Sequence, residues 1–137
     1  MKAFIDTSSL VKKYFEEEGS PQFEILLDDI SEITVSPIYW MEVNSAIGRR
    51  LHGGDLQERQ ARWIQKEAQK DLSYFSHILW NERLEQIAVE LLYKYQLKTL
   101  DSLQLASGLI SKPDIFLTSD KHLFSIAKKI FDQVRFV

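Results

Sequence analysis

Four acidic residues stand at positions that suit hydrolysis assisted by a metal ion: Asp6, Glu42, Asp101 and Asp120. Each lies at or near the predicted start of a helix, and none has a lysine or arginine three or four positions further on, where a helical ion pair would form. If they meet in the fold, two carboxylates about 4 Å apart repel each other by about 4 kcal/mol at an effective dielectric constant of 20. Protons or a divalent cation must then offset that repulsion.

The residue types favour a hard divalent cation, Mg²⁺ or Mn²⁺. The chain has no cysteine, and its three histidines lack metal-ligand spacing, which leaves carboxylate oxygens as the ligands. We predict that Asp6, Asp101 and Asp120 bind the metal, and that Glu42 is either a further ligand or a base that orients water. Such a site polarises a phosphodiester and generates hydroxide at neutral pH.

Hydroxyl side chains lie beside two of these acids. Thr7 follows Asp6, and Thr118 and Ser119 precede Asp120. We expect them to hold a carboxylate or a metal-bound water, although local turn or capping hydrogen bonds would explain each of them equally well.

A structural role also explains three of the acids taken singly. Aspartate is favoured at helix N-termini because it accepts hydrogen bonds from free backbone N–H groups, and this applies to Asp6, Asp101 and Asp120. Glu42 differs, because on a helical wheel it forms a narrow polar stripe with Ser45 and Arg49 on an otherwise apolar or small helix. Such a stripe should face a cleft or a partner.

The elements that must position these acids alternate between strands and helices. Short apolar runs predict strands at 2–6, 33–36, 115–119 and 134–137, and more weakly at 75–79. Apolar stripes and capping signals predict helices from Ser9 to Gly19, behind Ser20, behind Ser36, over 55–72, behind Asn81, behind Thr99 and behind Asp120. This alternation indicates an α/β sandwich around a mostly parallel sheet, with the acids along one rim at the carboxyl ends of the strands.

Length and composition predict one globular domain spanning residues 1–137. The chain is 45% hydrophobic and 27% charged, and neither a membrane-spanning run nor a signal peptide is recognisable, so we expect a cytoplasmic protein. The formal net charge of −3 argues against nucleic-acid binding through bulk positive charge. Neutralising the four acids changes that charge to +1, so the remaining surface is mildly cationic.

Basic and aromatic side chains are secondary candidates. Arg49, Arg50, Arg59 and Arg62 are candidates for contacting an RNA backbone, with a solvated helix face as the more common explanation. The aromatic residues in the middle of the chain are predicted to pack in the core or a dimer interface rather than to stack on bases.

Four motifs together resemble the PIN-domain nucleases, and most closely the VapC-type toxins of prokaryotic toxin–antitoxin pairs. They are FIDTSSL at 4–10, SPIYWMEVNSA at 36–46, LKTLDSLQLASG at 97–108 and LTSDKHLF at 117–124. By position, the resemblance makes Asp6, Glu42, Asp101 and Asp120 the catalytic acids. The sequence departs from many relatives in having Leu100 where they have arginine, and Ser102 where they have alanine.

The resemblance implies a three-layer α/β/α sandwich and a divalent-metal-dependent endoribonuclease. It also implies homodimers and inhibition by a cognate antitoxin whose tail covers the acidic site. Two alternatives stay open. One is a catalytically silent PIN fold that binds proteins, suggested by Leu100 and the aromatic residues. The other is a receiver-like or phosphatase-like domain, although FIDTS lacks the additional acid that such sites usually have nearby.

Overall fold

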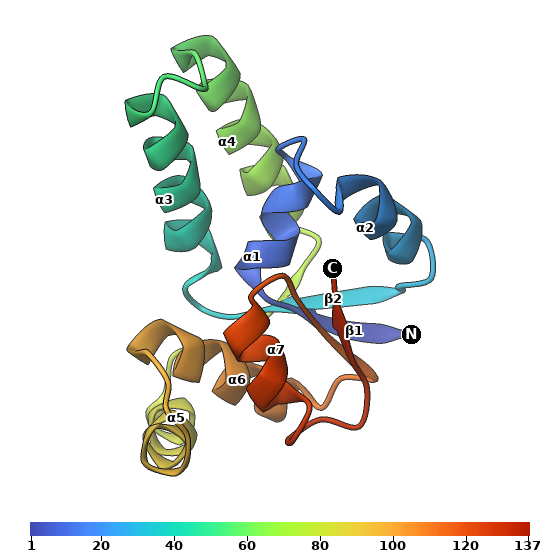
Figure 1. Cartoon of the computed structure of the whole chain (residues 1–137), viewed down its shortest axis with the longest axis vertical. Coiled ribbons are helices and arrows are strands. Elements are labelled where there is room, and N and C mark those ends of the chain that lie inside the picture. The colour runs from blue at the N-terminus through green and yellow to red at the C-terminus, as the bar shows by residue number, and fades with distance from the viewer.

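Five parallel strands form the central sheet of the computed structural model, which describes all 137 residues (Figure 1). The spatial order is β3-β2-β1-β4-β5, and every neighbouring pair runs parallel. The strands are β1 (Lys2–Ile5), β2 (Glu32–Val35), β3 (Ser76–His77), β4 (Ile115–Thr118) and β5 (Val134–Phe136). The predicted strands are therefore all present, the weakest of them reduced to two residues.

Seven α-helices and one 3₁₀ turn connect the strands. They are α1 (Thr7–Leu10), η1 (Val11–Lys13), α2 (Ser20–Leu27), α3 (Tyr39–His52), α4 (Glu58–Leu72), α5 (Glu82–Lys94), α6 (Thr99–Ser111) and α7 (Lys121–Ala127). None of these helices has the length and apolar character that crossing a membrane requires.

Two separate hydrophobic cores lie on the two faces of the sheet, and this makes the fold a three-layer α/β/α sandwich. Successive side chains of a strand point to opposite faces. Ala3 and Ile5 of β1 accordingly belong to the core shared with α1 to α4, whereas Phe4 belongs to the core shared with α5 to α7. Strands buried on both faces must be apolar throughout, which is why short continuous apolar runs predicted them.

Helix α6 packs very close to the sheet because residue 108 has no side chain. A Cβ atom at Gly108 would lie 2.8 Å from the ring of Phe116 and 2.9 Å from that of Phe131. The two rings stack with centroids 4.6 Å apart. Gly108 therefore allows α6, the helix that carries Asp101, to lie close against the sheet.

The predicted helix from Ser9 to Gly19 is wrong beyond its first turns. The helix α1 ends at Leu10, and η1 ends at Lys13. In the segment that follows, Glu17 forms ion pairs with Lys12 of η1 at 3.4 Å and with Arg50 of α3 at 2.9 Å. These ion pairs hold the segment in place of helical hydrogen bonds.

Three predicted caps are also wrong, while two are confirmed. The N-cap positions of α2, α3 and α6 are Gly19, Ile38 and Lys98 rather than the predicted Ser20, Ser36 and Thr99. The Ser20 hydroxyl instead donates to the Phe15 carbonyl, 3.1 Å away. Asn81 caps α5 by accepting from the Leu84 N–H at 2.9 Å, and Asp120 caps α7.

Helices α3 and α4 form a hairpin that extends away from the sheet (Figure 1). Its base is tied to the rest of the molecule through Tyr14, whose hydroxyl lies 2.7 Å from that of Tyr39 and donates to Asp71 at 2.7 Å. Lys13 completes this cluster with an ion pair to Asp71 at 2.6 Å. Since Tyr39 opens α3, the cluster fixes the end of α3 that carries Glu42.

Candidate active site

Two of the four acids follow the two central strands. Asp6 directly follows β1, and Asp120 comes two residues after β4, its neighbour in the sheet. From β1 the chain continues to β2 on one side, whereas β4 lies on the other side. The strand order therefore reverses between β1 and β4, and crevices at such points are where open α/β sheets bind ligands.

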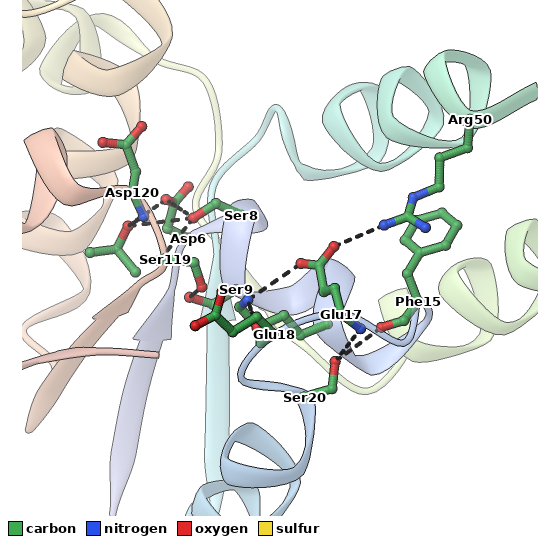
Figure 2. Close-up of polar contacts among 12 residues, drawn as sticks. Asp6, Ser8, Ser9, Phe15, Glu17, Glu18, Ser20, Arg50, Ser119 and Asp120 are labelled. Carbon is green, nitrogen blue, oxygen red and sulfur yellow. Dashed lines mark hydrogen bonds and ion pairs between the residues drawn. The ribbon is translucent and has the colours of Figure 1, made fainter. Parts of the chain in front are cut away.

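Asp6 is buried and held by hydroxyl groups. It is 4% exposed, and its Oδ2 accepts from Ser8 Oγ at 2.6 Å and from Thr118 Oγ1 at 2.8 Å (Figure 2). Although it occupies the N-cap position of α1, its side chain makes no capping hydrogen bond. Burial raises the pKa of Asp6, the hydroxyl hydrogen bonds lower it in part, and the charge of Asp101 raises it further.

Asp120 is both a helix cap and part of this hydroxyl network. Its Oδ1 accepts from the Leu123 N–H at 2.9 Å, while its own N–H donates to Thr118 Oγ1 at 3.1 Å. Its neighbour Ser119 donates its backbone N–H to Ser8 Oγ at 3.1 Å, and its hydroxyl lies 2.9 Å from that of Ser9. Helix capping therefore accounts for only one of the two carboxylate oxygens of Asp120.

Glu42 lies on α3 and is held by two donors from other helices. Thr7 Oγ1 of α1 donates to its Oε1 at 3.1 Å, and Gln104 Nε2 of α6 donates to the same oxygen. The other oxygen, Oε2, has no hydrogen-bond partner. Burial, then the charges of Asp6 and Asp101, raise the pKa of Glu42 to about 7, and the two hydrogen bonds act in the opposite direction.

Asp101 is half-buried in the first turn of α6 and makes no hydrogen bond through its side chain. Burial raises its pKa, and the charge of Asp120 adds to this effect, while the positive charges of His122 and Lys98 act against it. His122 is itself tied to the Gln96 carbonyl at 2.7 Å. Helix capping therefore does not explain the presence of Asp101.

Pairwise electrostatic effects on pKa values connect the four acids. Asp6 and Asp101 each raise the pKa of Glu42, Asp101 raises that of Asp6, and Asp120 raises that of Asp101. None of the four forms an ion pair with a lysine or arginine. The four acids therefore form an acidic cluster in which the pKa values of Asp6, Glu42 and Asp101 are raised and no member is ion-paired with a lysine or arginine.

The donor set fits a hard divalent cation, although the side chains are not yet arranged around one. No three histidine, aspartate or glutamate side chains lie close enough together to hold a metal ion as they stand. The ligands on offer are carboxylate oxygens next to fixed hydroxyls, which is the chemistry that Mg²⁺ and Mn²⁺ prefer. A bound cation would also stabilise the charged form of carboxyls whose burial disfavours it.

Gln104 is a site residue that the sequence reasoning missed. It is 1% exposed, and its Nε2 also donates to Thr7 Oγ1 at 3.3 Å, so it connects α6 with α1 and α3. Its signal in the sequence was a long polar side chain one turn after Asp101, within the apolar run from Leu103 to Ile110. Buried polar side chains need partners, and this one finds them in the site.

The four candidate arginines lie away from this cluster and in different environments. Arg50 is half-buried, with its guanidinium paired to Glu17 and 4.1 Å from the centroid of the Phe15 ring. Arg62 pairs with Glu58 at 3.5 Å on an exposed helix face, Arg49 donates to Ser45 at 2.9 Å, and Arg59 is exposed. Arg50 therefore has a structural partner, whereas the others are on the surface.

A family model described as PIN domain matches residues 3–129. No curated protein matches the chain by sequence. Among solved structures, the chain is similar to VapC20 from Mycobacterium tuberculosis, described as a Sarcin-Ricin loop cleaving toxin. The TM-score is 0.73 and the identity 17%, covering 97% of this chain and 98% of that one.

Two further structures have the same fold. A toxin–antitoxin complex from Klebsiella pneumoniae matches with a TM-score of 0.70 and 20% identity, over 97% of this chain and 95% of that one. FitAcB from Neisseria gonorrhoeae matches with a TM-score of 0.71 and 12% identity, over 98% and 96%. At these identities the similarity concerns the fold.

Proposed function

Since the chain belongs to the PIN domain family, we propose that it is a divalent-metal-dependent endoribonuclease that hydrolyses RNA phosphodiester bonds as the toxin of a toxin–antitoxin pair. The observation that carries this proposal is the acidic cluster of Asp6, Glu42, Asp101 and Asp120. The pKa values of Asp6, Glu42 and Asp101 are raised, and none of the four acids forms an ion pair with a lysine or arginine. A cluster of this kind destabilises the fold, and its presence is explained by a cation that binds there.

In the proposed reaction, Asp6, Asp101 and Asp120 would hold Mg²⁺ or Mn²⁺, with Glu42 as a further ligand or as the base. Such a cation would supply polarisation of the phosphodiester and a lowered pKa for its bound water. Thr118 and Ser8 hold one oxygen of Asp6. Thr7 and Gln104 hold Oε1 of Glu42 and leave Oε2 free, and with a pKa of about 7 this carboxylate is suited to accept a proton near neutral pH.

The toxin assignment also predicts partners. Several proteins of similar fold were solved as complexes of a toxin with its antitoxin. We propose that a cognate antitoxin covers the acidic site of this chain and that the chain forms homodimers. We also propose that the chain acts in the cytoplasm.

The experiment that tests the reaction is RNA cleavage by the purified chain in Mg²⁺, in Mn²⁺ and in EDTA. We expect cleavage with either metal, none in EDTA, and none by the Asp101→Asn variant with metal. The variant is suited to this test because Asp101 makes no hydrogen bond that its replacement would break. Equal cleavage with and without metal would remove the metal mechanism.

A catalytically silent binding module is the second candidate, because Leu100 is 50% exposed on the helix that carries Asp101. An exposed leucine beside the acids is suited to contacting a protein rather than a phosphate. Calorimetric titration distinguishes the two functions. Binding of Mn²⁺ that is lost in Asp6→Asn supports the nuclease, whereas no binding heat for the native chain supports the silent module.

A further inference from the structure

A surface cavity of about 520 Å³ adjoins the acidic cluster on the side of β5 and α2. Ser119 and Lys121, the two neighbours of Asp120 in the chain, both line it. The link to the cluster is direct, because the Ser119 N–H donates to Ser8 Oγ, and that hydroxyl donates to Asp6. The cavity and the acids therefore share one wall.

Cations outnumber acids around this cavity, in contrast to the cluster beside it. Lys12, Lys121 and Arg135 line it, and Glu18 is its one acidic side chain. A positively charged cavity next to a negatively charged cluster is complementary to a substrate whose phosphates continue beyond the reacting bond.

One of the three cations is built into the wall. The side chain of Lys12 is only 9% exposed, and its ammonium donates to the Glu18 carbonyl and pairs with Glu17. Glu17 shares its carboxylate with Arg50, so one negative charge serves two positive ones. In Figure 2, Ser9, Glu18 and Glu17 lie between the acidic site and Arg50, with Glu17 nearest to Arg50. Lys12 therefore presents to the cavity a positive charge that is only partly balanced by Glu17.

Resting on the proposed function, we propose that this cavity binds a phosphate group of the RNA strand adjacent to the scissile bond. Arg135 and Lys121 contact the phosphate from the exposed rim, and Lys12 contributes its charge from the wall. The cavity thus determines how the RNA strand is placed relative to Asp120. Phosphate contacts of this kind position a nucleic acid without reading its sequence.

The test is the affinity of the full chain for a short fluorescent single-stranded RNA, measured by anisotropy in EDTA between 50 and 200 mM salt. An Asp101→Asn background excludes cleavage. We expect Arg135→Ala and Lys121→Ala each to weaken binding roughly threefold to tenfold, and to reduce the slope of log Kd against log salt by about 0.7. Both side chains are exposed, so these variants should fold.

Two matched variants serve as controls. Arg83→Ala removes an exposed cation on α5, which does not line the cavity, and should leave both Kd and slope unchanged. Glu18→Gln removes the acidic side chain of the cavity and should tighten binding. The proposal is overturned if Arg135→Ala and Lys121→Ala behave like Arg83→Ala. It is also overturned if polyglutamate displaces the RNA as effectively as polyphosphate does, since the cavity then takes an acidic peptide.

This result is separable from that of the proposed function. Binding in EDTA does not depend on metal or on cleavage. If Asp101→Asn still cleaves RNA in Mg²⁺, the catalytic assignment is wrong, whereas the Kd and slope comparison still decides the role of the cavity.

Discussion

Gln104 donates through Nε2 to Oε1 of Glu42, so that a buried amide of α6 holds a carboxylate of α3 across 62 positions of the chain. Its own Oε1 is buried and has no partner. The orientation of the amide is therefore set by the hydrogen bonds that its Nε2 donates. This bond orients the Glu42 carboxylate with Oε2 free.

We expect Gln104→Met to lower kcat for RNA cleavage by about tenfold or more while KM changes little, since residues that orient a ligand or base typically contribute 10- to 100-fold. The substitution keeps the volume and removes the donor. Steady-state kinetics checks this, with Gln86→Met on the exposed face of α5 as the control. Equal kinetics for the two variants would show that Gln104 fills space only.

Stability of the metal-free protein should fall as pH rises through Glu42's titration. Its pKa is raised from 4.5 to about 7 in the fold, so between these values the folded state binds more protons than the unfolded state. The free energy of unfolding then decreases as pH rises. We expect Glu42→Gln to be more stable than the native chain by about 1–2 kcal/mol at pH 8, after discounting for partial exposure, and equal to it at pH 4.

Urea denaturation of both proteins in EDTA, at a series of pH values, measures this difference. The same difference at pH 4 and pH 8 would mean that the carboxylate of Glu42 is not destabilised by its surroundings.

Metal binding should restore the stability that the acids remove. At Mn²⁺ concentrations about 100 times Kd, a site confined to the folded state adds about 2.7 kcal/mol, which raises the unfolding midpoint by roughly 6–10 °C. EDTA should reverse the shift. Asp101→Asn should abolish it, whereas Glu90→Gln on the exposed surface of α5 should not. A shift of the same size in both variants would place the metal elsewhere.

Arg50 and Arg62 should differ in their effect on stability. Arg50 lies over Phe15 and pairs with the half-buried Glu17, so we expect Arg50→Ala to cost about 1–3 kcal/mol. The exposed pair of Arg62 with Glu58 contributes little, and Arg62→Ala should change stability by less than about 0.5 kcal/mol. Urea denaturation compares them, and equal effects would contradict the structural role of Arg50.

Patterns within single segments predicted the architecture well. The runs at β1 and β4 are apolar because both faces of a parallel sheet are covered, and Asn81 caps α5 through a hydrogen bond to a residue three positions away. The acids of the cluster stood out for a similar reason, because an ordinary surface carboxylate on a helix tends to have a cation one turn along. These signals are local, so one sequence contains them.

Predictions of local structure failed where side chains made contacts outside the regular helical pattern. After η1, Glu17 pairs with Lys12 and with the distant Arg50, and the Ser20 hydroxyl donates to the Phe15 carbonyl instead of capping α2. Short-range propensities are worth about 1 kcal/mol or less per residue, and tertiary contacts of this kind exceed them.

The sequence by itself determined the alternation of strands and helices, the acids and the kind of cation they suit. Only the tertiary structure decided that Thr7 and Gln104 hold Glu42, that capping explains Asp120 alone, and that a positively charged cavity adjoins the acids. The physical reason is range: periodicity, caps and helical ion pairs join residues within about one turn. The hydrogen bonds that join separate segments of the site, such as Thr7 to Glu42 and Thr118 to Asp6, connect residues 35 and 112 positions apart, and such pairs are set by the packing of the whole sheet.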